Sequence, residues 1–279
     1  MANLHSLLLL CTVVLLAGCA KSERPRAQDQ TVPIPSPSPI ASVAAKPSQA
    51  KQIDKTWTIK FDFATRKLNR AHNGIRSYEI SVEYPEIKQP TAHTLRFNSW
   101  IRRKVQGYVH EFQGLEQRAE AQDLRRKLGP VQITETLKIW FLVYYADEQL
   151  VSLRLSHSVM AIGQMHPITY YETINYDLKR GRLLSQHDVF KKNYLKAFSR
   201  YCRKFIPENY ELNPTEDWFQ KGTEAKRSNF PNWNIVPDGI LIAFEDYQIA
   251  SHSFGQLELI IPYSELREVL KPSAVIFIR

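Results

Sequence analysis

The chain has 279 residues, of which 43% are hydrophobic, 23% charged and 11% aromatic, a composition typical of a globular protein that excludes a collagen, a low-complexity scaffold and a fully disordered chain. Its three cysteines are too few for a disulfide-stapled miniprotein or a Cys-rich zinc module. The net charge of +9 predicts an anionic partner: membrane headgroups, cell-wall polymer or nucleic acid.

Residues 1–18 have the pattern of a bacterial lipoprotein signal peptide. The apolar run from Ser6 to Ala17 is too short to span a bilayer core of about 30 Å, but it has the length of a secretory h-region. It ends in Leu16-Ala17-Gly18-Cys19, which resembles a lipobox, so we predict cleavage before Cys19 and lipidation of its thiol. An ordinary signal peptide or a short membrane anchor is the alternative. Because Ala20 and Lys21 follow, rather than Asp, resemblance to enterobacterial lipoproteins favours the outer membrane, facing the periplasm.

Residues 19–52 are expected to form a disordered tether behind the lipid. The segment 20–52 holds six of the sixteen prolines and no aromatic residue, a composition that favours polyproline II and solvation. Five basic and two acidic residues give this segment +3, which leaves +6 from residue 53 onward. Since cleavage removes Cys11 and lipid occupies Cys19, only Cys202 remains, and the folded region must be held by its own core without a disulfide.

The first half of the folded region combines strands with one long helix. Alternating apolar residues predict strands over 56–64 and 77–87, and apolar residues at helical spacing predict a helix over 92–112 with Arg102, Arg103 and Lys104 on its polar side. Residues 113–127 either finish that helix or form a loop. Two alternating segments, 132–145 and 150–162, flank a short polar turn and predict a hairpin.

The second half continues the sheet and adds shorter helices. We expect strands over 167–178, 235–244, 257–261 and 274–278, and helices over 190–206, 215–228 and 264–270. Mixed strands and helices in this order predict an α+β fold with mainly antiparallel sheets and packed helices.

The helix predicted over 190–206 has two sharply different faces. Cys202 falls on the apolar face, which predicts a buried, unreactive thiol. The opposite face is basic and could dock on anionic lipid or polymer, or could be a solvated face over a core stripe. Its members are Lys192, Lys196, Arg200, Arg203 and Lys204.

The sequence offers no recognisable catalytic or cofactor motif. It contains no Gly-rich phosphate loop, nucleophile elbow or dinucleotide fingerprint, and no His pair at the i, i+4 spacing of a helical zinc site, so we expect no cofactor, no metal and no catalysis. Ser-His-Ser occurs at 156–158 and 251–253, but His157 lies on an apolar strand face, which favours a core histidine. An envelope hydrolase stays open if His157, His166 and His252 converge with a nucleophile or carboxylate.

Several C-terminal motifs resemble one extracytoplasmic domain family. They are NYDLKRGRLL at 175–184 followed by Asp-Val-Phe at 188–190, the segment 238–255 that begins DGILIAF, IPYSEL at 261–266, and GQMHP at 163–167. Together they resemble the RsiV-like family, found in the ectodomain of a lysozyme-sensing anti-sigma factor and beside the catalytic domain of some peptidoglycan deacetylases. The upstream half resembles, more loosely, the domain that usually precedes it. The resemblance implies two sequential subdomains, 53–163 and 164–279.

The resemblance also implies a non-catalytic envelope protein that binds a cell-wall component or a lysozyme-type enzyme. The candidate binding residues are His166, Tyr247, His252, Phe254 and Tyr263. Because lysozyme is cationic, a domain of charge +6 would need a local acidic patch to bind it. A structural envelope lipoprotein is a further alternative, and nucleic acid is not expected for an exported protein.

Overall fold

The computed structural model describes most of the chain after residue 57. The described residues are 58–72, 77–89, 91–115, 119–128, 134–162, 164 and 166–277. The signal peptide, Cys19 and the tether lie outside these ranges, so those expectations remain predictions. Within the described ranges, no helix is both long and apolar enough to cross a membrane.

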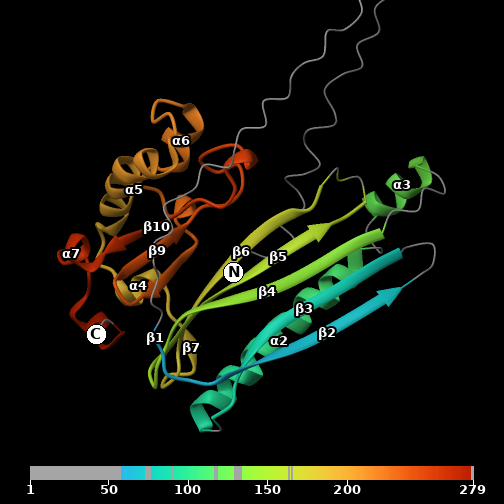
Figure 1. The fold of residues 1–279 in the computed structure, drawn as a ribbon, viewed down its shortest axis with the longest axis horizontal. Helices are drawn as coiled ribbons and strands as arrows, with labels where there is room; N and C mark the ends of the chain where they lie inside the picture. The colour runs from blue at the N-terminus through green and yellow to red at the C-terminus, as the bar shows by residue number, and fades with distance from the viewer. Residues whose placement is uncertain are drawn as a thin grey trace, which may run out of the picture. The chain divides into compact units, whose positions relative to one another are not determined.

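A seven-stranded sheet occupies the first half of the fold (Figure 1). Its strands follow the order β2-β3-β4-β5-β6-β7, with β1 paired to β4 in parallel. Neighbours along this order are antiparallel except β3 and β4, which run parallel because a helical segment connects them. The bounds are β1 Thr58–Ile59, β2 Phe63–His72, β3 Ser77–Ile87, β4 Thr134–Ala146, β5 Leu150–Met160, β6 Ile168–Asp177 and β7 Arg182–Leu183.

Helix α2 (Ala92–Gly114) covers one face of this sheet, and α3 (Ala119–Leu128) follows it. Thr91 and Thr94 form a capping box that satisfies the first free amides of α2. Phe97, Ile101 and Val105 of α2 are buried, as the apolar spacing of the helix predicts.

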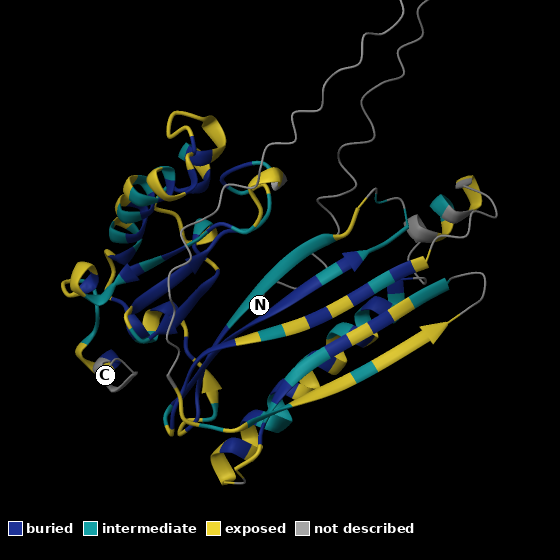
Figure 2. Cartoon of the chain, in the orientation of Figure 1, coloured by how far each residue is buried: buried dark blue, intermediate teal, exposed yellow. Residues whose placement is uncertain are grey.

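The opposite face of the sheet is partly exposed. Leu137 and Ile139 of β4 are buried on the α2 side, whereas Trp140 and Leu142 are each 41% exposed on the other side, an alternation visible in Figure 2. His157, paired with Ile139 across the β4–β5 ladder, is buried on the α2 side as well. The expectation of a core histidine is confirmed.

A second sheet, β10-β9-β8, packs on that opposite face through buried amides. Its strands are β8 Trp233–Val236, β9 Gly239–Ala243 and β10 Glu258–Pro262. Asn175 of β6 accepts from the Ser152 hydroxyl (2.9 Å) and the Ile235 amide (2.9 Å), and donates to the Trp233 carbonyl (2.9 Å). Asn234 donates to the Leu153 carbonyl (2.9 Å). These bonds place β8 across β5 and β6.

Helices cover the far side of the second sheet. They are α4 Gln186–Val189, α5 Tyr194–Tyr210, α6 Asp217–Gly222 and α7 Tyr263–Leu266. The 3₁₀ turns are η3 Arg227–Asn229 before β8, η4 His252–Phe254 between β9 and β10, and η5 Pro272–Phe277 after α7. The main apolar core lies between α5 and this sheet, and it includes Cys202 with no exposed surface. The expected burial of Cys202 is therefore confirmed.

The α+β fold with mainly antiparallel strands is confirmed, and several expectations need correction. The expected boundary between residues 163 and 164 lies between β5 and β6, which pair over ten residues, so the first sheet continues to β7. The helix predicted over 190–206 begins later and extends further, as α5 Tyr194–Tyr210, because Phe190 ends α4 and bridges to Leu270. The strand predicted over 274–278 is wrong, because η5 occupies Pro272–Phe277.

Candidate functional site

Exposed aromatic side chains gather where α6 meets the connection between β9 and β10. The rings of Trp218 and Tyr247 meet edge to face with centroids 6.3 Å apart, and each residue is 49% exposed. Phe254, in the same connection as Tyr247, is 42% exposed. We call Trp218, Tyr247 and Phe254 the aromatic edge. Large exposed aromatics are enriched where proteins bind partners.

The backbone of Tyr247 is held in an uncommon conformation. Its φ is +64°, in the left-handed region that bulky residues rarely adopt. The side chain of the next residue, Gln248, fixes the turn. Its Nε2 donates to the carbonyl groups of Gly222 (3.2 Å) and Asn229 (2.8 Å), and its Oε1 accepts from the Glu245 N–H (3.1 Å). Strain of this kind persists where the surrounding structure imposes it, and it clusters at functional sites.

Gly222 lets the connection lie directly against α6. A Cβ atom at Gly222 would lie 2.2 Å from the Gln248 carbonyl oxygen and 2.7 Å from a side-chain carbon of Ile249, which no side chain can accept. Because the two segments approach so closely, Trp218 on α6 and Tyr247 in the connection are presented together.

Carboxylates flank the aromatic edge. Glu216 and Asp217 precede Trp218, and Glu245 and Asp246 precede Tyr247. Asp217 is paired with Lys221 on the same helix (2.9 Å). Burial raises the pKa of Glu245 to about 7. A hydrogen bond from Asn232 favours the charged form and opposes this rise, but burial has the larger effect. The edge therefore presents Glu216, Asp217 and Asp246 as its acidic groups, whereas Glu245 is mostly buried and holds its proton up to about pH 7.

The sequence-predicted binding residues take different places. Tyr263 is partly buried, its hydroxyl donates to the Val236 carbonyl (2.7 Å) and burial raises its pKa, so it anchors α7. His166 is exposed beside Pro167, in the connection between β5 and β6. His252 is the first residue of η4, and its side chain is not among those that the structure describes. Of that set, Tyr247 and Phe254 share one connection.

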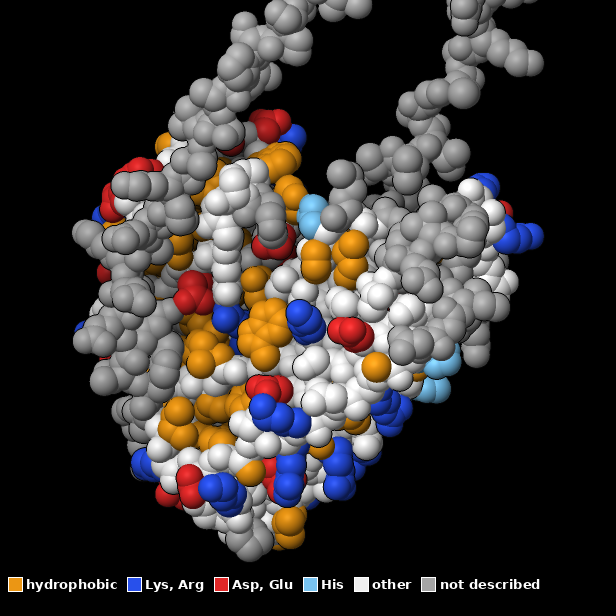
Figure 3. Space-filling model, turned by 45° about the vertical axis from the view of Figure 1, so that its right-hand side comes forward, with side chains coloured by type: hydrophobic (Ala, Val, Ile, Leu, Met, Phe, Trp, Pro, Cys, Tyr) orange, Lys and Arg blue, Asp and Glu red, His pale blue; other side chains and the backbone are white. Residues whose placement is uncertain are grey.

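The basic residues around α5 do not all face solvent alike. Lys192 precedes the helix, and Lys196, Arg200 and Lys204 are exposed on it. Arg203 is partly buried and donates to the Thr223 hydroxyl (3.0 Å) and the Gln220 carbonyl (2.7 Å), which ties α5 to α6. On the surface shown in Figure 3, basic, acidic and hydrophobic side chains are mixed.

The three histidines proposed for a hydrolase lie on different parts of the fold. His157 packs edge-on against Tyr108 of α2, with ring centroids 4.3 Å apart, and burial lowers its pKa to about 4. His252 belongs to the connection of the second sheet, which packs on the opposite face of the first sheet. The described residues contain no cluster of His, Cys, Asp or Glu that could hold a metal ion.

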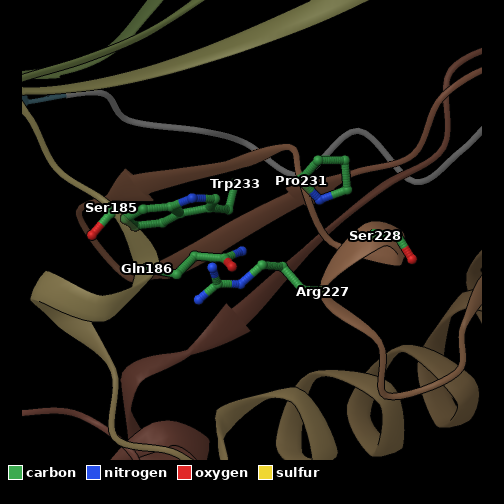
Figure 4. A pocket seen from close by; sticks show the side chains of 6 residues that line it. All are labelled: Ser185, Gln186, Arg227, Ser228, Pro231 and Trp233. Carbon is green, nitrogen blue, oxygen red and sulfur yellow. The ribbon is translucent and has the colours of Figure 1, made fainter. Parts of the chain in front are cut away.

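Two surface hollows are lined by residues that do not belong to the aromatic edge. Ser185, Gln186, Arg227, Ser228, Pro231 and Trp233 line one of about 460 Å³, where the Arg227 side chain lies beside Gln186 and below the Trp233 ring (Figure 4). The side-chain amide of Gln186 already accepts from the Tyr194 hydroxyl (2.7 Å) and donates to the Phe230 carbonyl (2.6 Å). The other, of about 330 Å³, lies against α2.

Sequence reasoning missed Trp218 and the hollow on α2. The available signal for Trp218 was an aromatic residue directly after two acidic ones in a short polar helix. The signal for the α2 hollow was the i, i+4, i+7 spacing of Arg96, Trp100 and Arg103, which places them on one helical face.

Comparison with known proteins identifies the second half of the fold. Residues 187–264 match the family described as "Protein of unknown function (DUF3298)". The chain is 26% identical over 201 residues to the peptidoglycan-N-acetylmuramic acid deacetylase PdaC of Bacillus subtilis. That match covers 71% of this chain but only 40% of the deacetylase.

Two solved structures share the fold. A DUF3298 family member from Bacteroides fragilis superposes with a TM-score of 0.60 at 17% identity, covering 80% of this chain and 98% of the other. A DUF3298 family protein from Pseudomonas aeruginosa gives 0.51 at 17% identity, covering 76% and 96%. Residues 187–264 therefore match the DUF3298 family, in agreement with the resemblance expected for the C-terminal part of the chain.

Proposed function

We propose that this chain is an extracytoplasmic, non-catalytic binding protein that captures a cationic cell-wall-degrading enzyme of the lysozyme type through the aromatic edge. One observation carries the proposal: an exposed Trp218–Tyr247 pair, with Tyr247 at a φ of +64°, stands beside three acidic residues, Glu216, Asp217 and Asp246. Rigid aromatic side chains bury a large area on binding and lose little conformational entropy.

The charge of the edge suits such a partner better than the charge of the whole chain does. Electrostatic complementarity accelerates encounter and selects partners, and it acts locally when salt limits its range to about 8–10 Å. Glu216, Asp217 and Asp246 supply the local acidic patch that a cationic protein needs, although residues 53–279 carry +6.

The proposed location brings this surface to the cell wall. A lipid on Cys19 anchors the chain to the outer membrane, facing the periplasm, and the tether to residue 52 spans roughly 30 Å as a coil and on the order of 100 Å when extended. The similarity to an enzyme named for acting on peptidoglycan supports a place at the wall.

Titration calorimetry of the full-length chain in detergent with hen lysozyme tests the proposal. Tyr247→Asn removes the ring but tolerates the left-handed backbone, and it should weaken binding about 30-fold, as for an interface hot spot. Trp140→Ala, which removes a similarly exposed Trp from the first sheet, should bind like the original chain. Affinity should fall as salt rises.

Three outcomes would overturn the proposal. The chain could fail to bind lysozyme, as a structural lipoprotein would; Trp140→Ala and Tyr247→Asn could weaken binding equally; or affinity could be indifferent to salt. Hydrolysis of peptidoglycan by the purified chain would instead favour an envelope hydrolase built on carboxylates.

A further inference from the structure

The hollow against α2 has a chemical character different from that of the aromatic edge. Arg96, Trp100 and Arg103 line it from one face of α2, Tyr176 of β6 lies beneath them, and Gly181 of the turn after β6 closes one side. Its volume of about 330 Å³ is near the lower end of the 300–1,000 Å³ typical of small-molecule sites. A ligand of one or two rings would fill it.

The two guanidinium groups of the hollow have no carboxylate partner among the described side chains. Neighbouring cations do have one: Arg180 pairs with Asp177 (2.9 Å) and Arg182 with Asp188 (2.7 Å). Arg96 instead contacts a ring nitrogen of His93 (2.7 Å), and both Arg96 and Arg103 are exposed. They are therefore free to bind an anion from outside.

Both cations act on the phenol at the base of the hollow. Burial raises the pKa of Tyr176, while the charges of Arg96 and Arg103 oppose this rise. Both guanidinium groups therefore lie close enough to Tyr176 to influence its phenol.

Aromatic surface accompanies this positive charge. The Trp100 ring lies 5.2 Å from that of Tyr176 and 6.4 Å from that of Phe97, measured between centroids, so it is supported from within while Trp100 remains partly exposed. Aromatic rings of this kind pack against apolar faces of ligands. Leu95, 54% exposed, extends the apolar rim.

The turn after β6 lies against the Arg96 side chain at Gly181. Gly181 has a φ of +68°, and a Cβ atom there would lie 3.3 Å from a terminal nitrogen of Arg96. The Asp177 carboxylate fixes the turn by accepting from the Arg180 amide (2.8 Å). The sequence NYDLKRG thus serves two surfaces, because Asn175 clamps the second sheet while Tyr176 faces α2.

We propose that this hollow binds an acidic saccharide, with one sugar ring against Trp100 and its carboxylate between Arg96 and Arg103. An inorganic anion would leave the Trp100 surface unused, and a neutral sugar would leave both guanidinium groups without a counter-charge. A ligand that combines a ring with apolar C–H faces and a carboxylate satisfies both. The site is independent of the aromatic edge, so either proposal can fail without the other.

Titration of the full-length chain in detergent with two disaccharides of the same ring skeleton tests this site. The acidic probe is N-acetylglucosaminyl-N-acetylmuramic acid, and the neutral probe is N,N′-diacetylchitobiose. The acidic disaccharide should bind at least about 10-fold more tightly, because hydrogen bonds to charged groups contribute about 1.5–3 kcal/mol. The double variant Arg96→Gln/Arg103→Gln should lose this preference, with an unchanged circular dichroism spectrum.

Arg102→Gln provides the matched control. Arg102 is an exposed neighbour on α2 that does not line the hollow, so removing its charge should leave binding within about twofold. Equal binding of the two disaccharides, an equal loss with Arg102→Gln, or binding of neither disaccharide would overturn the proposal. Preferential binding of an oligothymidine, lost in the Arg96→Gln/Arg103→Gln variant, would overturn it in favour of a nucleic acid.

Discussion

Replacing Glu245 with Gln should change how folding stability depends on pH. Burial raises the pKa of Glu245 from 4.5 to about 7, so between these values the unfolded chain has released a proton that the folded chain still holds. The contribution of Glu245 is fully present below pH 4.5 and is lost as pH rises towards 7. At about 1.4 kcal/mol per pKa unit, the loss amounts to ~3 kcal/mol.

His157 acts in the opposite direction. Burial, followed by the charge of Lys104, lowers its pKa from 6.5 to about 4. Its contribution to stability is present above pH 6.5 and is lost as pH falls through the window to about 4. Between pH 4.5 and 6.5 the two residues change the free energy of unfolding in opposite directions, each by about 1.4 kcal/mol per pH unit, so the two slopes nearly cancel.

Urea unfolding followed by circular dichroism at several pH values in this window measures the effect. Relative to the original chain, Glu245→Gln should gain stability with rising pH by about 1.4 kcal/mol per unit, and His157→Gln should lose it at the same slope. Glu208→Gln, at an exposed position on α5, should give a profile parallel to the original. A parallel profile for Glu245→Gln would refute the argument that this carboxyl is folded in its neutral form.

The remaining predictions concern packing and burial. Asn175→Ala should lower the free energy of unfolding by about 3 kcal/mol, seen as a lower urea midpoint, because buried partners on both sheets lose their hydrogen bonds; a change below 1 kcal/mol would contradict this. Gly222→Ala should destabilise and weaken lysozyme binding, whereas Gly107→Ala, with nothing within 4 Å of the added carbon, should stabilise α2 by about 0.5–1 kcal/mol. Burial raises the pKa of the Cys202 thiol, so peptide mapping should show it unlabelled by iodoacetamide until urea unfolds the chain; rapid native labelling would count against a buried thiol.

Local patterns were sufficient to predict much of the fold. The strand over 77–87 is β3 without change, and the hairpin around the polar turn at 146–149 is β4 and β5, because each depends on alternation within one segment. The strand predicted over 235–244 instead divides into β8 and β9, since Pro237 and Asp238 turn the chain there.

The candidate site was harder to predict because it depends on contacts distant in sequence. Trp218 belongs to it only because Gly222 and Gln248, 26 residues apart, pack together. The strained backbone of Tyr247 has no local sequence marker, since glycine is the usual residue at such a φ. Similarly, the two cations of the α2 hollow are recognisable only once their neighbours are seen to be paired with carboxylates.

Amide hydrogen exchange of the full-length chain, with and without saturating hen lysozyme, tests the central claim most directly. We predict that protection will increase in residues 216–222 and 245–255, which carry the aromatic edge, and that α2 will be unchanged. Protection confined to α2 or to the basic residues of α5, or none at all, would contradict the claim that the aromatic edge binds such an enzyme.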